Sequence, residues 1–134
     1  MCHALVVDND VLATRALGRL LRDDGQRVSP FENPHEALSA LRRWPFDLVI
    51  SDLEMPEADG RAVLRIARER QPNACVVIVT ARALDVATSL LAEGACVVAD
   101  KPLDYAALFS FLATCRARSA RERHEGIFLR AARR

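Results

Sequence analysis

The sequence predicts one α/β domain built on a parallel sheet, and three observations carry this prediction. Five short apolar segments alternate with five segments whose apolar residues recur at helical spacing. Consecutive positions of these short segments are apolar, as in strands of a parallel sheet that helices cover on both faces. Polar residues follow them at their carboxyl ends, where open α/β sheets place their sites: Asp8, Asp52, Thr80 and Lys101.

Length and composition fit a single globular domain with a sizeable core. The chain has 134 residues, 51% hydrophobic and 28% charged, and a net charge of +1. Charge is uneven: residues 1–115 hold 12 Arg/Lys against 16 Asp/Glu, whereas residues 116–134 hold seven Arg against two Glu. A basic tail could contact nucleic acid or an acidic protein face. A solvated helix end is the simpler interpretation, so we do not expect a nucleic-acid partner.

Cysteine usage and the chain start exclude several protein classes. No two of the four cysteines form a C-x-x-C pair, so neither a zinc nor a redox site is indicated. The start MCHALVVDND reaches charge at once, unlike a signal peptide. No segment approaches the ~18–20 apolar residues that cross a bilayer. We therefore expect a cytoplasmic protein without membrane association.

The first two strands and helices follow in order. A strand is expected at residues 3–7, and a helix at 11–24 with apolar residues at i, i+4 spacing. A weaker strand is expected at 27–31, where Pro30 favours a sheet edge. Asn33 can cap the next helix, which has Pro34 at its first position and runs to about residue 43.

The remaining elements repeat the alternation. Strands are expected at 46–51, 74–79 and 95–99, and helices at 59–71, at 84–93 and from 105 onward. Asp59 and Asp104 are the expected N-caps of two of these helices. Residues 1–116 would form the domain, and the basic extension, 117–134, would continue the last helix. A small apolar cluster at 127–129 could contact a partner or a second copy.

The polar residues at the strand ends suit one kind of chemistry. Clustered carboxylates repel each other unless a cation lies between them, and oxygen ligands suit Mg²⁺. Lys101 is the only lysine in the chain, and its compact charge suits one phosphate or carboxylate oxygen. Thr80 adds a hydroxyl donor. This set suits an Asp that attacks phosphorus and then carries an acyl phosphate.

Four motifs in this order resemble one known family. They are VVDND at 6–10, SDLEMPEADG at 51–60, VTA at 79–81 and GACVVADKP at 94–102. Over about residues 3–115 the chain resembles the response-regulator receiver domain of two-component signal transduction, in a stand-alone, CheY-like form. The resemblance implies a flavodoxin-like (βα)5 fold with strand order 2-1-3-4-5.

The resemblance also implies roles for individual residues. Asp52 would accept a phosphoryl group from a phosphohistidine of a sensor histidine kinase or a histidine phosphotransfer protein. Thr80 and Lys101 would hold the phosphoryl oxygens, and a cis bond before Pro102 would aim the lysine. The Mg²⁺ ligands would be Asp8, Asn9, Asp52 and the backbone carbonyl of Glu54.

Several positions depart from the family pattern. Asn9 stands where an acid is usual, so we expect weaker metal binding; Asp10 could compensate or could start the helix. Val98 replaces a usual aromatic, so the relay to the outer face would be absent or different. Glu54 and Arg82 could pair across the mouth of the site and slow attack by water, or could both point to solvent.

Three hypotheses follow. The first is a phosphorylatable switch that signals to a downstream protein, or dimerises, through the fourth helix, fifth strand and fifth helix or through the tail. It would catalyse only its own phosphotransfer and dephosphorylation. The second is a pseudo-receiver that works as an interaction scaffold regardless of phosphorylation, motivated by Asn9 and Val98. The third is a haloacid-dehalogenase-like phosphatase with Glu54 as general acid, although a cap domain and a further acidic pair are missing.

Overall fold

The computed structural model describes residues 2–117 and 126–132, which form a six-stranded parallel sheet with five helices. The strands are β1 (His3–Val7), β2 (Arg27–Phe31), β3 (Leu48–Asp52), β4 (Cys75–Thr80), β5 (Val97–Asp100) and β6 (Ile127–Leu129). The helices are α1 (Val11–Asp23), α2 (Pro34–Arg43), α3 (Gly60–Arg70), α4 (Ala83–Ala92) and α5 (Tyr105–Ala117). The strand order β2-β1-β3-β4-β5-β6 confirms the predicted flavodoxin-like fold and adds a sixth strand.

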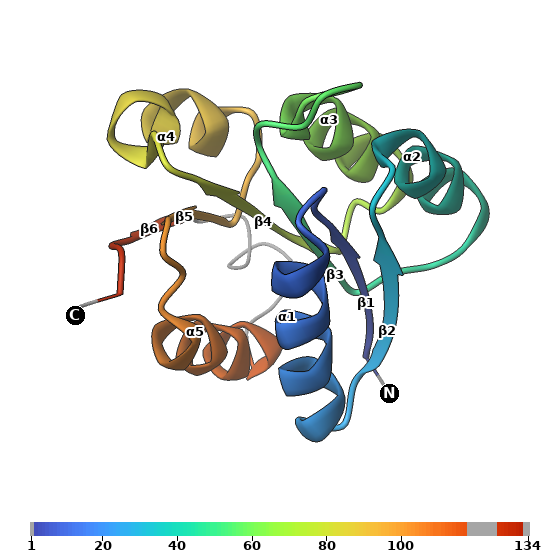
Figure 1. Ribbon diagram of the computed structural model, residues 1–134, viewed down its shortest axis with the longest axis horizontal. Coiled ribbons are helices and arrows are strands. Elements are labelled where there is room, and N and C mark those ends of the chain that lie inside the picture. Colours follow the sequence, from blue (N-terminus) through green and yellow to red (C-terminus); the bar gives the residue numbers. More distant parts are fainter. Residues whose placement is uncertain (1, 118–125, 133–134) are drawn as a thin grey trace.

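The helices form two layers around the sheet. Figure 1 shows α2, α3 and α4 over one face, with α1 and α5 over the other. Alternate residues of β1 divide between two buried clusters: Leu5 belongs to the α2–α3–α4 side, and Val6 belongs to the α1–α5 side. All residues of β3 and β4 are buried. The apolar runs in the sequence therefore reflect burial on both faces, as expected.

Four helices begin at side-chain caps, three of which the sequence predicted: Asn33, Asp59 and Asp104. Asp10 accepts from the backbone N–H of Leu12, and Asn33, Asp59 and Asp104 each accept from a backbone N–H in the first turn of their own helix. Each such bond satisfies a donor that the helix leaves free, worth about 1 kcal/mol. The predicted helix starts are thus confirmed to within a residue or two.

The two edges of the sheet are built differently. β2 forms one edge and contains Pro30, as predicted. The other edge is β6 instead of β5, and the expected helical continuation of the tail is wrong for Ile127–Leu129. The other part of that prediction, at 118–125, lies outside the described residues. Ile127 and Leu129 pack on the α1–α5 side and Phe128 on the α2–α3–α4 side, which only a strand allows.

No helix among residues 2–117 and 126–132 is long and apolar enough to cross a membrane.

Candidate functional site

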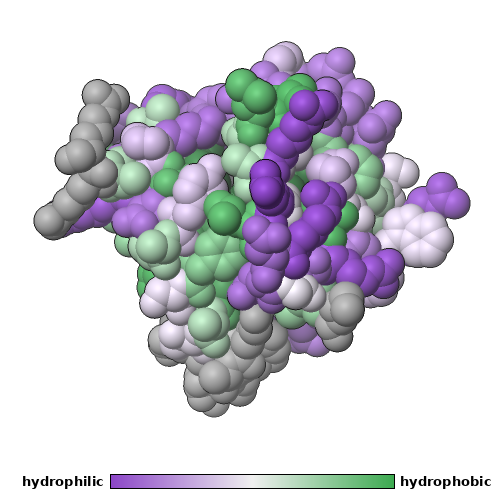
Figure 2. Space-filling view, turned by 60° about the horizontal axis from the view of Figure 1, so that its bottom comes forward, coloured by the Kyte–Doolittle hydropathy of each residue, from purple (hydrophilic) through white to green (hydrophobic). Residues whose placement is uncertain are grey.

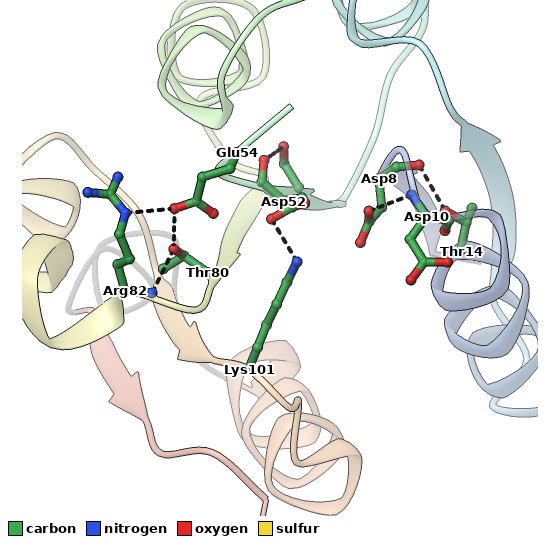
Figure 3. A network of polar contacts seen from close by, with 9 residues as sticks. Asp8, Asp10, Thr14, Asp52, Glu54, Thr80, Arg82 and Lys101 are labelled. Carbon is green, nitrogen blue, oxygen red and sulfur yellow. Dashed lines mark hydrogen bonds and ion pairs between the residues drawn. The ribbon is translucent and has the colours of Figure 1, made fainter. Parts of the chain in front are cut away.

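The carboxyl ends of the strands bring the predicted site residues together, as Figure 3 shows. Lys101, which follows β5, places its Nζ 3.1 Å from Oδ1 of Asp52, the last residue of β3. Two backbone hydrogen bonds connect the strand ends. Leu53 N–H donates to the Val79 carbonyl at 2.9 Å, and Lys101 N–H donates to the Thr80 carbonyl at 3.0 Å. The sheet therefore sets the position of the Asp52–Lys101 pair.

Asp52 lies in a setting that disfavours its negative charge. Its carboxylate is only 4% exposed, and burial raises the pKa of Asp52. The hydrogen bond and charge of Lys101 lower this pKa, but the negative charges of Asp8 and Glu54 act in the same direction as burial. An additional cation beside Asp52 would favour the ionised form.

A second polar network lies on the other side of Asp52. The Thr80 hydroxyl donates to Oε1 of Glu54 at 2.7 Å, and Arg82 Nε donates to the same oxygen at 3.1 Å. The Arg82 backbone N–H donates to the Thr80 hydroxyl at 3.1 Å. Glu54 and Arg82 therefore do pair across the mouth of the site. The Thr80 hydroxyl donates to Glu54 here and not toward Asp52.

These contacts also govern the charge of Glu54. Burial raises the pKa of the Glu54 carboxyl, but the hydrogen bonds from Thr80 and Arg82, with the arginine's charge, outweigh burial and lower it below its ordinary value. Glu54 is therefore a stable acceptor for both partners.

The residues expected to bind metal supply oxygen donors, but few charges. Asp8 Oδ1 accepts from Asp10 N–H at 2.8 Å, and the Asp10 carboxylate caps α1, so Asp10 starts the helix. Asn9 lines a separate hollow of about 500 Å³ beside Glu54. Among residues 2–117 and 126–132, no three His, Cys, Asp or Glu side chains form a metal-binding group. Two carboxylates, one amide and one carbonyl still match the hard oxygen donors that Mg²⁺ takes.

The sequence did not identify Gly60 as part of the site. A Cβ on Gly60 would lie 2.6 Å from the backbone oxygen of Asp52 and 2.9 Å from Cα of Leu53. Gly60 N–H also donates to Leu53 at 2.8 Å. The start of α3 thus packs directly on the end of β3. The only signal in the sequence was Asp59, the expected N-cap of this helix, which indicates nothing about contact of Gly60 with the acceptor.

The site also includes a cavity that the sequence did not predict. It encloses about 470 Å³ between α1 and α5, with Asp52 and Lys101 at one end and Leu17, Val79 and Tyr105 along its walls. Figure 2 shows hydrophobic surface beside strongly hydrophilic side chains on this face of the molecule. The Lys101–Pro102 peptide bond at the rim is cis, as the resemblance implied.

Comparisons with known proteins agree on the family. The sequence model of the response regulator receiver domain matches residues 4–113. The transcriptional regulator NtrC of Salmonella typhimurium is 39% identical over 100 residues, and ZraR of Klebsiella oxytoca is 39% identical over 102 residues. These matches cover 74% and 75% of this chain but only 21% and 23% of the relatives.

Solved structures give the same result for the fold. A CheY-like receiver domain from Methanospirillum hungatei superposes with a TM-score of 0.81 at 22% identity, covering 93% of this chain and 98% of that one. The TrrA response regulator of Thermotoga maritima, solved with Mg²⁺ and beryllofluoride, has a TM-score of 0.75 at 26% identity, covering 85% and 98%. With its strand-end Asp, Thr and Lys in place, the chain belongs to the response regulator receiver domain family.

Proposed function

We propose that this receiver is a phosphorylation switch in which Asp52 takes a phosphoryl group from a phosphohistidine of a sensor kinase or phosphotransfer protein. The observation that carries the proposal is the buried Asp52 carboxylate, 3.1 Å from the ammonium of Lys101 at the carboxyl edge of the sheet. A nucleophile and a cation for the transferred group are thereby already adjacent.

The chemistry follows from these positions. An oxygen of Asp52 attacks phosphorus, the P–N bond of the donor breaks, and its electron pair stays on the imidazole nitrogen. The product is an acyl phosphate on Asp52. Lys101 then pairs with a phosphoryl oxygen, because the esterified oxygen of Asp52 no longer carries a full charge. Mg²⁺, held by Asp8, Asn9, Asp52 and the Glu54 carbonyl, would supply positive charge to the phosphoryl oxygens.

The bond between Thr80 and Glu54 adds a rearrangement to the phosphorylation of this protein. For Thr80 to donate to a phosphoryl oxygen, its hydroxyl must leave Glu54, which it contacts at 2.7 Å. We propose that the Glu54–Arg82 pair covers the mouth of the site and slows attack by water on the acyl phosphate. The lifetime of the phosphorylated form would then depend on this pair.

One structural neighbour supports the magnesium requirement. TrrA was solved with Mg²⁺ and beryllofluoride. NtrC is described as a DNA-binding transcriptional regulator, but this chain spans about a fifth of it. For this chain we propose signalling in the cytoplasm by contact with a downstream protein, with no catalysis beyond its own phosphotransfer and dephosphorylation.

The experiment is labelling with radioactive acetyl phosphate in the presence and absence of Mg²⁺. Wild type is expected to take up one base-labile phosphoryl group with Mg²⁺, whereas Asp52→Ala takes up none. No labelling of wild type, or equal labelling of Asp52→Ala, would contradict the proposal.

A phosphorylation-independent scaffold is the second candidate. It is favoured by Asn9, which leaves the proposed metal site with one negative charge fewer, and by the Thr80 hydroxyl, which donates to Glu54 and not toward Asp52. A scaffold would bind no Mg²⁺ at millimolar concentration, and Asp52→Ala would bind its partner as wild type does.

The phosphatase hypothesis finds less support, because Glu54 Oε1 accepts from Thr80 and Arg82 and is not free to donate a proton. Turnover of an aryl phosphate would support the phosphatase hypothesis.

A further inference from the structure

Residues 126–132, here called the C-terminal segment, lie along the edge of β5. The segment is held by backbone bonds at both ends: Ile127 N–H donates to Cys96 at 2.8 Å, and Ala132 N–H donates to Pro102 at 2.8 Å. Between them, Phe128 stands beside Val98 in parallel register. Figure 1 shows this strand at the edge of the sheet, between the layers that contain α4 and α5.

The segment fits its site closely. A Cβ on Gly126 would lie 2.7 Å from the backbone oxygen of Ala95 and would also overlap the Leu91 side chain at the end of α4. Phe128 packs with the cluster that contains Leu90 and Val98, on the α4 side of the sheet. This docking therefore depends on the position of α4.

The same helix begins at the phosphoacceptor site. α4 starts at Ala83, directly after Arg82, whose side chain bonds Glu54 and whose N–H bonds the Thr80 hydroxyl. No side chain caps this helix, and its first residue, Ala83, is buried in the core next to the Arg82 contacts. One short helix thus connects the Thr80–Glu54–Arg82 network to the groove of the C-terminal segment.

We propose that the C-terminal segment is an intramolecular ligand of the α4–β5–α5 surface, and that its docking and phosphorylation of Asp52 oppose each other. The coupling rests on the proposed function. A phosphoryl group on Asp52 takes the Thr80 hydroxyl from Glu54, which alters the contacts of Arg82 and the start of α4. Because Gly126 has no free space against Leu91 near the end of α4, a shifted α4 no longer fits the segment.

Reciprocity fixes the converse effect. A ligand that binds one state of a protein better lowers the affinity of any ligand of the other state by the same factor. The docked segment must therefore weaken binding of a phosphoryl analogue, and its release must strengthen it. We expect a change of roughly fivefold or more, at the low end of known couplings.

The test uses the full chain with two undocked variants and one matched control. Gly126→Val introduces the clash with Ala95, and Phe128→Ala removes the apolar anchor without a clash. Gly18→Ala is the control, because its Cβ would meet the flexible Arg22 side chain at 3.4 Å and Val28 at an ordinary contact distance of 3.7 Å. Exchange of the Ile127 amide hydrogen reports docking, and titration with beryllofluoride in Mg²⁺ reports the phosphorylated-like state.

Both undocked variants are expected to lose protection at Ile127 and to bind beryllofluoride about fivefold more tightly, with Gly18→Ala like wild type. Saturating beryllofluoride should speed exchange at Ile127 in wild type. Undocked variants with wild-type beryllofluoride affinity, or unchanged protection in both variants, would overturn the inference. Absence of beryllofluoride binding in every protein would overturn the proposed function and the coupling, while loss of protection at Ile127 would still establish docking.

Discussion

The Lys101 and Thr80 sides of Asp52 differ in whether their side chains already contact the acceptor carboxylate. On one side, Lys101 already points at the acceptor carboxylate, with Nζ 3.1 Å from Oδ1. On the other, the Thr80 hydroxyl donates to Glu54, which Arg82 also holds. The comparison indicates that the Lys101 side is preformed for attack, whereas on the Thr80 side the bond to Glu54 must break before the hydroxyl can contact the product. Breaking that bond also alters the contacts of Arg82 at the start of α4.

The largest effect is expected from Lys101, on the preformed side. Lys101→Ala leaves the buried Asp52 without its ion-pair partner and removes the charge that would hold a phosphoryl oxygen. We expect labelling by acetyl phosphate to fall by roughly 100-fold, since comparable charged groups contribute about 3 kcal/mol to transfer. The measurement is the initial labelling rate with Mg²⁺. A rate within threefold of wild type would show that Lys101 is not required.

Gly60 tests whether the preformed side depends on the backbone beneath it. Gly60→Ala places a Cβ 2.6 Å from the Asp52 backbone oxygen, so the start of α3 or the end of β3 must move. We expect a loss of about 1–3 kcal/mol in the free energy of unfolding, typical of an overpacked core. Urea unfolding measures it, with Gly18→Ala as a control expected to be neutral or slightly stabilising. Equal stability of both variants would contradict the close packing.

Glu54 tests the side that must rearrange. Glu54→Ala frees the Thr80 hydroxyl and removes the partner of Arg82. Beryllofluoride affinity is expected to rise by roughly fivefold, for a lost hydrogen bond of about 1 kcal/mol. The acyl phosphate is expected to hydrolyse faster, because the mouth of the site opens. Arg82→Ala is the companion variant: it should hydrolyse faster with a smaller gain in affinity. Slower hydrolysis in both variants would refute the covering role.

We expect the buried charge of Asp52 to destabilise the unmodified protein. Its carboxylate is buried with Lys101 as its ion-pair partner, and Asp8 and Glu54 add repulsion. Asp52→Asn removes the buried charge, while Lys101, 38% exposed, remains solvated. We expect the unmodified protein to gain about 1 kcal/mol, or roughly 3 °C in Tm. Thermal unfolding without Mg²⁺ measures this gain. A lower Tm for the variant would mean that the ion pair is net stabilising.

The smallest effect is expected far from both sides, at His3 on the amino end of β1. Burial lowers the pKa of His3, the charge of Arg27 acts in the same direction, and the ring nitrogen Nε2 lies 2.7 Å from the Ser29 hydroxyl. The unfolded chain therefore binds the proton more readily than the folded one. The stability due to neutral His3 is complete above about pH 6.5 and declines as pH falls toward the folded pKa.

His3→Gln should remove that decline without changing phosphorylation. Tm measured between pH 7.5 and 5.5 is expected to fall less in the variant than in wild type. An identical fall in both proteins would show that His3 does not contribute. Since His3 is distant from Asp52, this variant also serves as a control for the effects at the site.

Local pattern predicted most of this architecture. Apolar runs located the five main strands, and the caps Asn33, Asp59 and Asp104 located the starts of three helices, because both features depend on near neighbours in the chain. The strand-end rule also brought Asp52 and Lys101 together. What the sequence did not predict depends on contacts between distant segments.

The tail is the main example. Ile127–Leu129 form an apolar trio that is too short to show a helical or strand period, and its partner, β5, lies about 30 residues earlier. The Thr80–Glu54 bond and the contact of Gly60 with Asp52 likewise depend on loop geometry. Side-chain direction in loops is set by the whole fold, so residue type and spacing left the pairing of Glu54 with Arg82 open.

The most direct test of the difference between the two sides of Asp52 is a structure of the chain with Mg²⁺ and beryllofluoride. We predict that Lys101 Nζ moves from Asp52 to a fluorine atom. We also predict that the Thr80 hydroxyl leaves Glu54, now 2.7 Å away, to donate to another fluorine. A bound beryllofluoride with the Thr80–Glu54 bond intact would contradict this prediction, because the Thr80 side of the site would then need no rearrangement.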